Sequence, residues 1–399
     1  MNYSFDSVPE DDPLVKSVFH HLLIAFAWPA RWPSALVFVA GGLLALAAAF
    51  VWVLRGAPAA DALLVFLIQA AFFVADYDLL AALPRRRLSF GPWQSQIFAL
   101  ALPRMAAAMV MGLLYPWLGW RAAFYLNLAI QGAGTLALYR GAIVEPGRLA
   151  MSELAIRSDR LAPGSAPLRV LHISDLHIER LGDREAKLLE LARSAAPDII
   201  VITGDYVNIS YNVDPLTHAH VRELLGQLSA PGGVFAILGS PAVDVRETLP
   251  IFEGLPVCLL RNETIYHTGP QGQPVTILGV DCIHNLEKDR AGFGRVMAST
   301  SEHGPAILLH HSPDLMPEAI GHGIDLYVCG HTHGGQVRLP LIGPILTSSK
   351  LGRRYVMGHY HENRTHLYVS RGVGFEGLGA PRVRLFCPPE ITLITIEPA

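Results

Sequence analysis

The segment "LRVLHISDLH", residues 168–177, determines how the second half of the chain is interpreted. Its first six residues are mostly aliphatic, which is typical of a strand buried in a sheet. A polar tip follows at once, in which Asp175 and His177 are two residues apart and therefore lie on one face of an extended chain. This pattern predicts a buried strand whose carboxyl end carries functional side chains.

Strands and helices alternate after this segment. The spacing of apolar residues predicts helices over 183–195 and around 221–228, and apolar runs predict strands over 199–203, 234–238, 275–280, 306–310 and 325–329. Such alternation indicates an α/β domain with mostly parallel inner strands, which we place over residues 167–399.

Polar residues follow most of these strands directly. Ligands of open α/β sheets gather outside the carboxyl ends of the strands, so we expect the strand tips to converge. Carboxylates and imidazoles without a thiolate favour Mn, Fe or Zn. Two ions that share one carboxylate form the arrangement that clamps the attacking and leaving oxygens of a phosphoryl displacement. The candidate ligands are Asp175, His177, Asp205, His311, His331 and His333.

One strand tip differs from the others. The segment "AILGSPAVD", residues 236–244, ends its apolar run in Gly239, Ser240 and Pro241. None of these three residues is a strong metal ligand, an acid or a base. This segment therefore has the apolar strand and the glycine that other tips have, but lacks their acidic and imidazole side chains.

The strand tips together resemble the motifs of the calcineurin-like metallophosphoesterases, and the resemblance covers about residues 167–398. It rests on Asp175-Leu176-His177, Gly204-Asp205, His311 and Gly330-His331-Thr332-His333. The ending at 383–391 is similar to that of a bacterial branch in which some members are tethered to membranes.

The resemblance implies a central β-sandwich flanked by helices and a site for two divalent metal ions. One ion would be held by Asp175, His177, Asp205 and His333, and the second by the bridging Asp205, His311 and His331. A metal-bound hydroxide would attack phosphorus in line, without a phosphoenzyme. Asn208 lies where the family often has a polar residue near the phosphate.

The chain departs from the family pattern at the third strand tip. The family usually has Gly-Asn-His there, with the Asn as a ligand of the second metal and the His as proton donor or transition-state stabiliser. Ser240 and Pro241 occupy these two places. The second metal site is therefore expected to be weaker, and loss of a general acid typically costs about 10²–10⁴ in rate. Asp244 is either a substitute ligand or a solvated loop carboxylate.

The first half of the chain is far more apolar than the second. The whole chain is 51% hydrophobic and 16% charged, with a mean hydropathy of +0.34. A bilayer core needs about 20 apolar residues in a helix, and residues 34–54 form an uncharged run of that length. Further spans are predicted over 62–83, 97–120 and 122–139, although the last two also fit buried helices of a soluble domain. We therefore predict an N-terminal or interfacial segment (1–33), a four-helix transmembrane domain (34–140) and a linker (141–166).

Basic residues predict the orientation of these spans. Arginines concentrate in the loop after the second span and in the segment after the fourth, which places the N-terminus and the soluble domain in the cytoplasm. The acidic start, "MNYSFDSVPEDD", does not predict a cleavable signal peptide. Four isolated cysteines also fit a reducing compartment. Asp76, Asp78 and Arg104 lie toward the cytoplasmic ends of the spans, where either an Asp–Arg contact or snorkelling charges are expected.

These features predict a phosphoesterase anchored in the inner (plasma) membrane that faces the cytoplasm. Its substrate would be a phosphodiester or a pyrophosphate, lipid-linked or of the nucleotide-lipid kind, and the net charge of −3 does not indicate a nucleic-acid polymer as partner. The alternative is a catalytically impaired module that binds or senses a phosphorylated ligand at the membrane. A transporter with a regulatory soluble domain would rest on Asp76, Asp78 and Arg104 alone.

Overall fold

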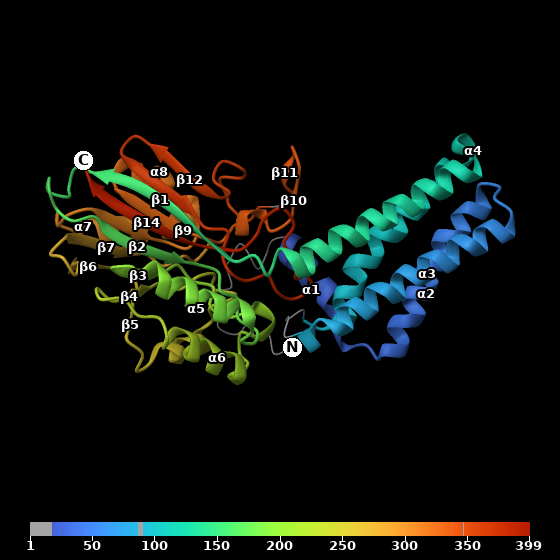
Figure 1. The fold of residues 1–399 in the computed structure, drawn as a ribbon, viewed down its shortest axis with the longest axis horizontal. Coiled ribbons are helices and arrows are strands. Elements are labelled where there is room, and N and C mark those ends of the chain that lie inside the picture. The colour runs from blue at the N-terminus through green and yellow to red at the C-terminus, as the bar shows by residue number, and fades with distance from the viewer. Residues whose placement is uncertain (1–17, 87–90, 346) are drawn as a thin grey trace. The chain divides into compact units, whose positions relative to one another are not determined.

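The computed structural model describes residues 18–86, 91–345 and 347–399. These residues divide into two compact units, coloured by position along the chain in Figure 1. An α/β unit comprises residues 143–376 and 383–399, and a helical unit comprises residues 18–142 and 377–382. Residues 1–17 of the predicted N-terminal segment and Arg87 of the basic loop lie outside the described residues.

The α/β unit contains two six-stranded sheets. The first has the order β1 (Ala150–Ser158), β14 (Glu390–Pro398), β2 (Leu168–Ile173), β3 (Ile199–Ile202), β4 (Val234–Ala236) and β5 (Val257–Leu259). The second has the order β12 (Gly358–Glu362), β13 (Thr365–Val369), β9 (Leu326–Cys329), β8 (Ala306–Leu309), β7 (Pro274–Gly279) and β6 (Glu263–Thr268). A small hairpin joins β10 (Arg338–Leu339) to β11 (Gly343–Pro344). Strands β2 to β5 pair in parallel, as do β7, β8, β9 and β13.

The two sheets pack face to face through one apolar cluster. It contains Val170 and Val201 from the first sheet and Ile277, Ile307 and Val328 from the second, all fully buried. Helices α7 (Leu286–Ala298) and α8 (Met316–Gly321) pack on the other face of the second sheet. The predicted β-sandwich with flanking helices is therefore present. The remaining helices of this unit are α5 (Asp183–Ala195), α6 (Pro215–Leu225) and the short turns η4 (Ile209–Tyr211), η5 (Arg246–Phe252), η6 (Pro313–Leu315) and η7 (His333–Gly335).

The linker predicted over 141–166 needs correction, because residues 150–158 form β1. This strand pairs in parallel with β14 at the edge of the first sheet. Only one of its faces is buried: Leu154 and Ile156 pack against the core, whereas Glu153 and Arg157 are exposed. An edge strand with one polar face buries few apolar residues, so its sequence looks like a connecting segment.

The helical unit consists of α1 (Val18–Ala27), η1 (Trp28–Arg31), α2 (Ser34–Leu54), α3 (Ala59–Ala82), η2 (Pro84–Arg86) and α4 (Trp93–Tyr139), with a π-helical turn, η3 (Arg140–Val144), after it. In the described residues, three helices are long and apolar enough to cross a membrane by length and composition: α2, α3 and the helix that runs from Trp93 to Val144.

Helix α4 folds back on itself near its middle. Gly119 has a left-handed φ of 72° with ψ of 163°, which interrupts the helix. Arg104 Nη1 donates a hydrogen bond of 2.8 Å to the carbonyl oxygen of Gln131, 27 residues further along. A straight helix would separate two such residues by roughly 40 Å. The two arms of α4 therefore lie side by side, and they correspond to the third and fourth predicted spans.

A buried ion pair joins α3 to α4. Arg104 Nε lies 2.7 Å from Asp76 Oδ2, and Arg104 Nη2 lies 2.9 Å from Asp76 Oδ1. Arg104 also contacts Gln131 and Thr135 on the second arm of α4. The predicted Asp–Arg contact is thus confirmed, whereas Asp78 is exposed. A single guanidinium connects three helical segments.

Loss of this ion pair is expected to destabilise the helical unit. Arg104→Ala leaves the Asp76 carboxylate buried without a partner, and breaking a buried pair in this way typically costs about 3–5 kcal/mol. Thermal unfolding of the full chain in detergent should therefore begin at a lower temperature in Arg104→Ala and in Asp76→Ala. Asp78→Ala, two residues away on the same helix, is the matched control and should leave the transition unchanged. Equal transitions in all three variants would contradict a structural role for the pair.

Candidate metal centre

The loops after four strands bring the predicted ligands to one edge of the sandwich. Asp175 and His177 follow β2, and Asp205 follows β3 in the first sheet. His311 follows β8, and His331 and His333 follow the adjacent β9 in the second sheet. Parallel strands end at the same edge, so the order of the strands places these six residues close to one another.

The first group of side chains consists of Asp175, His177, Asp205 and His333. Each is buried, and one ligand atom from each lies within 4.8 Å of the others. His177 Nε2 is 3.1 Å from His333 Nε2 and 3.4 Å from Asp205 Oδ2. Asp175 Oδ1 is 3.6 Å from His333 Nε2. Four nitrogen and oxygen donors therefore surround one point.

A second group begins on the other side of Asp205. Its Oδ2 atom lies 3.3 Å from His311 Nε2 as well as 3.4 Å from His177 Nε2. The His331 ring is next to His311, with centroids 5.0 Å apart. Ser240 Oγ lies 3.2 Å from His311 Nε2 and 3.4 Å from Asp205 Oδ2. Asp205 thus occupies the position that a carboxylate shared by two ions needs.

The backbone at these ligands is unusual. Five of the six have a positive φ, between 41° and 68°. Residues other than glycine rarely adopt this backbone region. Each such residue raises the free energy of the folded state by about 1–3 kcal/mol, and such residues are typical of functional sites. Close approach also requires glycine: a Cβ at Gly239 would lie 2.2 Å from Asp205 Oδ1, and a Cβ at Gly330 would lie 1.9 Å from Asp175 Oδ2. The five residues are Asp175, His177, Asp205, His331 and His333.

Burial keeps most of the imidazoles neutral. It lowers the pKa of His177 and of His331 to about 4 and lowers the pKa of His333 well below its ordinary value. His311 differs: burial alone would lower its pKa, but the charge and hydrogen bond of Asp205 outweigh burial and raise it to about 10. Burial and the Asp205 charge, opposed by His311, raise the pKa of Asp175 to about 6. Two carboxylates therefore share a site in which His311 is the one imidazole with a raised pKa.

The donors at this edge fit divalent metal ions. Ionised carboxylates are costly to bury unless a cation compensates them. Nδ1 of His177 and Nε2 of His331 are buried and have no hydrogen-bond partner among the described residues. Imidazole and carboxylate donors without a thiolate suit Mn, Fe or Zn. The first group therefore matches the ligand set expected for the first ion, and the second ion and the roles of all six residues as ligands remain predictions.

Asp244 has a structural role, which differs from both roles considered from the sequence. Its Oδ2 accepts hydrogen bonds from the backbone N–H groups of Asp205 (2.8 Å) and Gly239 (2.7 Å), and its Oδ1 accepts one from Tyr206 (2.9 Å). The side chain is 5% exposed, so it is also not a solvated loop carboxylate. Asp244 ties the tip of β4 to the loop that carries Asp205.

Both polar groups of the Asn208 side chain likewise form hydrogen bonds with backbone groups. Its Oδ1 accepts a hydrogen bond of 2.9 Å from Ser210 N, and its Nδ2 donates one of 3.0 Å to Phe375 O. This arrangement caps η4, and the expected position of Asn208 near the substrate stays a prediction. Pro241 is half-buried and, together with Arg246, Arg261 and other residues, lines a cavity of about 320 Å³ beside the tip of β4.

The sequence analysis missed two residues at this edge. Arg384 is fully buried, and its Nη2 lies 3.4 Å from His333 Nδ1; burial lowers its pKa to about 10. His284 follows β7, and its ring centroid is 4.6 Å from that of His331. A signal for His284 was available, because it follows the predicted strand 275–280 in the way that the other ligands follow theirs. Arg384 lies in a tail segment with no such signal.

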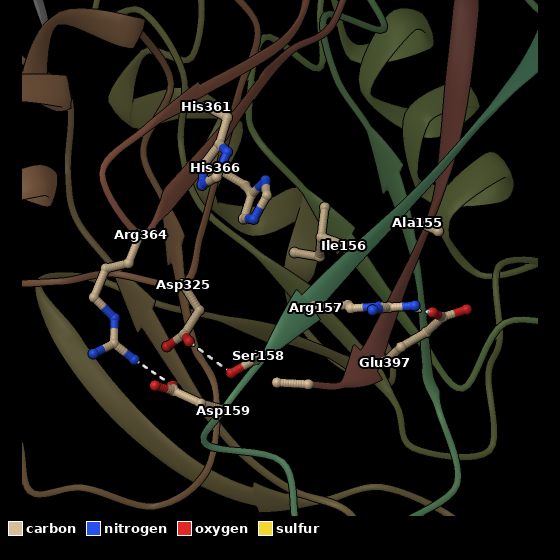
Figure 2. A pocket seen from close by; sticks show the side chains of 11 residues that line it. Ala155, Ile156, Arg157, Ser158, Asp159, Asp325, His361, Arg364, His366 and Glu397 are labelled. Carbon is tan, nitrogen blue, oxygen red and sulfur yellow. Dashed lines mark hydrogen bonds and ion pairs between the residues drawn. The ribbon is translucent and has the colours of Figure 1, made fainter.

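A separate cavity of about 700 Å³ lies at the opposite end of the sheets. Its lining comes from the carboxyl ends of β1 and β14 and from residues around β9, β12 and β13 (Figure 2). Polar and charged groups in this cavity pair with one another: Ser158 Oγ donates a hydrogen bond of 2.7 Å to Asp325 Oδ1, and Arg364 forms an ion pair with Asp159. Carboxylates and imidazoles do not converge there as they do around Asp205, so we place the functional site at the ligand edge.

Comparisons with known proteins show which family the α/β unit resembles. The sequence model of the calcineurin-like phosphoesterase family matches residues 168–335. The uncharacterized metallophosphoesterase YkuE of Bacillus subtilis is 31% identical over 271 residues, which cover 64% of this chain and 87% of YkuE. The phosphodiesterase YaeI of Escherichia coli is 30% identical over 268 residues, which cover 63% of this chain and 90% of YaeI.

Metal binding at this edge is expected to release protons. Near about pH 7 the metal-free site holds a proton on His311, whose pKa is about 10, and a bound ion must displace it. Below about pH 6 a second proton competes at Asp175, whose pKa is about 6. Affinity for Mn²⁺ should therefore decrease as the pH falls. Calorimetry in buffers with different ionisation enthalpies measures the released protons, and a binding heat independent of the buffer would contradict this expectation.

Proposed function

Because the chain belongs to the calcineurin-like phosphoesterase family, we propose that it is a metal-dependent phosphoesterase that hydrolyses a phosphodiester or pyrophosphate bond. The observation that carries this proposal is the convergence of two carboxylates and four imidazoles at one edge of the sandwich, with Asp205 between the two groups. The relative YaeI, which bears the name phosphodiesterase, supports the same reaction class.

The residues of the chain would hold and orient the reacting groups. Two divalent ions, when bound, supply Lewis acidity and a low-pKa water, which are the usual contributions of such a pair. Asp205 would be the carboxylate shared by both ions, and the neutral imidazoles of His177, His331 and His333 are in the form that binds metal. The strained backbone and the close-packed glycines hold these side chains in place before substrate arrives.

The tip of β4 restricts the type of substrate. Pro241 has no side-chain group that can protonate a leaving group. A leaving group of low pKa, such as a phosphate in a pyrophosphate, needs such a proton least. We therefore favour a pyrophosphate, or a diester with a similarly acidic leaving group, over an alkyl diester.

The helical unit supports a membrane setting for this substrate. Three helices have the length and composition of membrane spans, and the arginine distribution favours a cytoplasmic α/β unit. We propose an enzyme of the inner (plasma) membrane whose substrate is lipid-linked or a nucleotide-lipid, rather than a nucleic-acid polymer. This part of the proposal rests on the presence of the helical unit and the α/β unit in the same chain.

Ser240 and Pro241 favour a second candidate function. If the second ion binds too weakly for hydrolysis, the α/β unit would bind or sense a phosphorylated ligand without turning it over. The first group of ligands is compatible with this role, since its four donors alone would suffice to hold one ion. Turnover by the purified chain separates the two functions.

Hydrolysis should depend on Asp205. The full chain in detergent, supplied with Mn²⁺, is expected to hydrolyse bis(4-nitrophenyl) phosphate. Asp205→Asn should lower kcat/KM by at least about a hundredfold, because each ion loses a charged ligand and with it several kcal/mol of transition-state stabilisation. Asp183→Asn changes an exposed carboxylate on α5 and serves as the matched control. Turnover that is absent from the wild type, or equal in both variants, would contradict the enzyme proposal.

Restoring the family motif should increase activity. The double variant Ser240→Asn with Pro241→His supplies an amide ligand and a proton donor at the tip of β4. We expect the larger gain with a diester of high leaving-group pKa, up to about 10²–10⁴-fold for a restored general acid, and a smaller gain with the nitrophenyl ester. An equal effect on both substrates would show that proton donation is not what this tip lacks.

A further inference from the structure

His284 lies beside the second group of ligands although no family motif includes it. It follows β7, which pairs in parallel with β8, the strand that precedes His311. Its ring centroid is 4.6 Å from that of His331 and 6.4 Å from that of His311. The side chain is 6% exposed. Its position is therefore part of the ligand edge, next to His331 of the second group.

The two ring nitrogens of His284 have different surroundings. Nδ1 lies 3.9 Å from Cys282 Sγ, a weak contact that fixes the ring orientation. Nε2 is buried and has no hydrogen-bond partner among the described residues, and the same holds for Nε2 of the adjacent His331. Buried polar side-chain atoms nearly always have a partner. Two such nitrogens on neighbouring imidazoles indicate a ligand between them.

The backbone at His284 matches that of the other ligands. Its φ is +57°, within the range of the five strained ligand residues. Neighbouring loop residues hold both imidazole-bearing segments: Lys350 Nζ donates to His284 O, and Ser348 Oγ donates a hydrogen bond of 2.9 Å to His331 O. These two contacts hold the backbone of His284 and that of His331 to one loop.

We propose that His284 is a ligand of the second metal ion and takes the place of the asparagine that the family usually supplies from the tip of β4. The second ion would then be held by Asp205, His311, His331 and His284, a set of one carboxylate and three imidazoles suited to Zn or Mn. Metal-bound histidines usually have their other ring nitrogen oriented by a neighbour, and Cys282 does this for His284. The inference rests on the proposed function, because it assigns a residue to the same metal centre.

Metal titration of the full-length, metal-stripped chain in detergent tests this assignment. The wild type should bind two Mn²⁺ ions, measured by the EPR signal of the free ion. His284→Gly removes the imidazole while allowing the positive φ, and it should weaken the second ion by at least about tenfold and leave the first unchanged. His284→Asp should recover much of the affinity, because it returns a carboxylate ligand.

Two controls keep the loss specific to His284. His322→Gly removes an exposed histidine elsewhere and should bind both ions like the wild type. Ser240→Ala should also retain the second ion, since the hydroxyl is not the ligand that holds it. If His284→Gly does not fold, a crystal structure of the Zn-loaded wild type decides the question: Nε2 of His284 should lie at about 2.0–2.1 Å from the second ion.

The outcomes separate this assignment from the proposed function. Two ions bound with wild-type affinity by His284→Gly, or a second Zn ion out of reach of His284, would overturn the role of His284 and leave the phosphoesterase proposal standing. A wild type that binds one ion, equally well in His284→Gly, would also overturn it. A wild type that binds no metal would contradict the proposed function and this assignment together.

Discussion

The carboxylate of Asp205 lies between two groups of imidazoles, and much of the surrounding structure holds it there. The backbone N–H of Ser240 donates a hydrogen bond of 2.7 Å to its Oδ1. Asp244 accepts hydrogen bonds from the backbone of Asp205 and of Gly239, which ties the tip of β4 to the loop after β3. The tip of β4 therefore has a structural role that does not depend on an asparagine or a histidine side chain. This explains why its frame is present although its usual side chains are absent.

Because the tip of β4 lacks an asparagine, we propose that the fourth ligand of the second ion comes from the loop after β7. A hydroxyl at Ser240 is a weak neutral ligand, whereas His284 presents, next to His331, a buried imidazole nitrogen that has no hydrogen-bond partner among the described residues. The proton donor that the family usually has at the tip of β4 is missing, because Pro241 has no side-chain group that can donate a proton. The chain is thus expected to differ from other family members less in metal binding than in the leaving groups that it can release.

Much of the fold could be predicted from the sequence, for physical reasons that also explain the errors. Buried strands such as 168–173 and 199–202 consist of nearly continuous apolar runs, so both they and the polar tips after them are visible. The contact between Asp76 and Arg104 could be predicted because charges inside apolar helices need partners. The edge strand β1 was missed because it buries one face only.

The surroundings of other site residues could not be predicted. Asp244 and Asn208 are polar residues in loops beside the centre, and the sequence does not show that backbone groups occupy their side chains. His284 was overlooked because the tip of its strand was not compared with the others. These hydrogen bonds join side chains to backbone groups both nearby and far apart in the chain, and the spacing of residues alone does not encode them.

The most direct test of this account is the metal content of the full-length protein after dialysis against metal-free buffer, measured by elemental analysis. An intact centre around Asp205 predicts two divalent ions per chain, both lost when Asp205 is replaced by Ala. A wild-type protein that retains no Mn, Fe or Zn, even after reloading, would contradict the metal centre on which the proposed function depends.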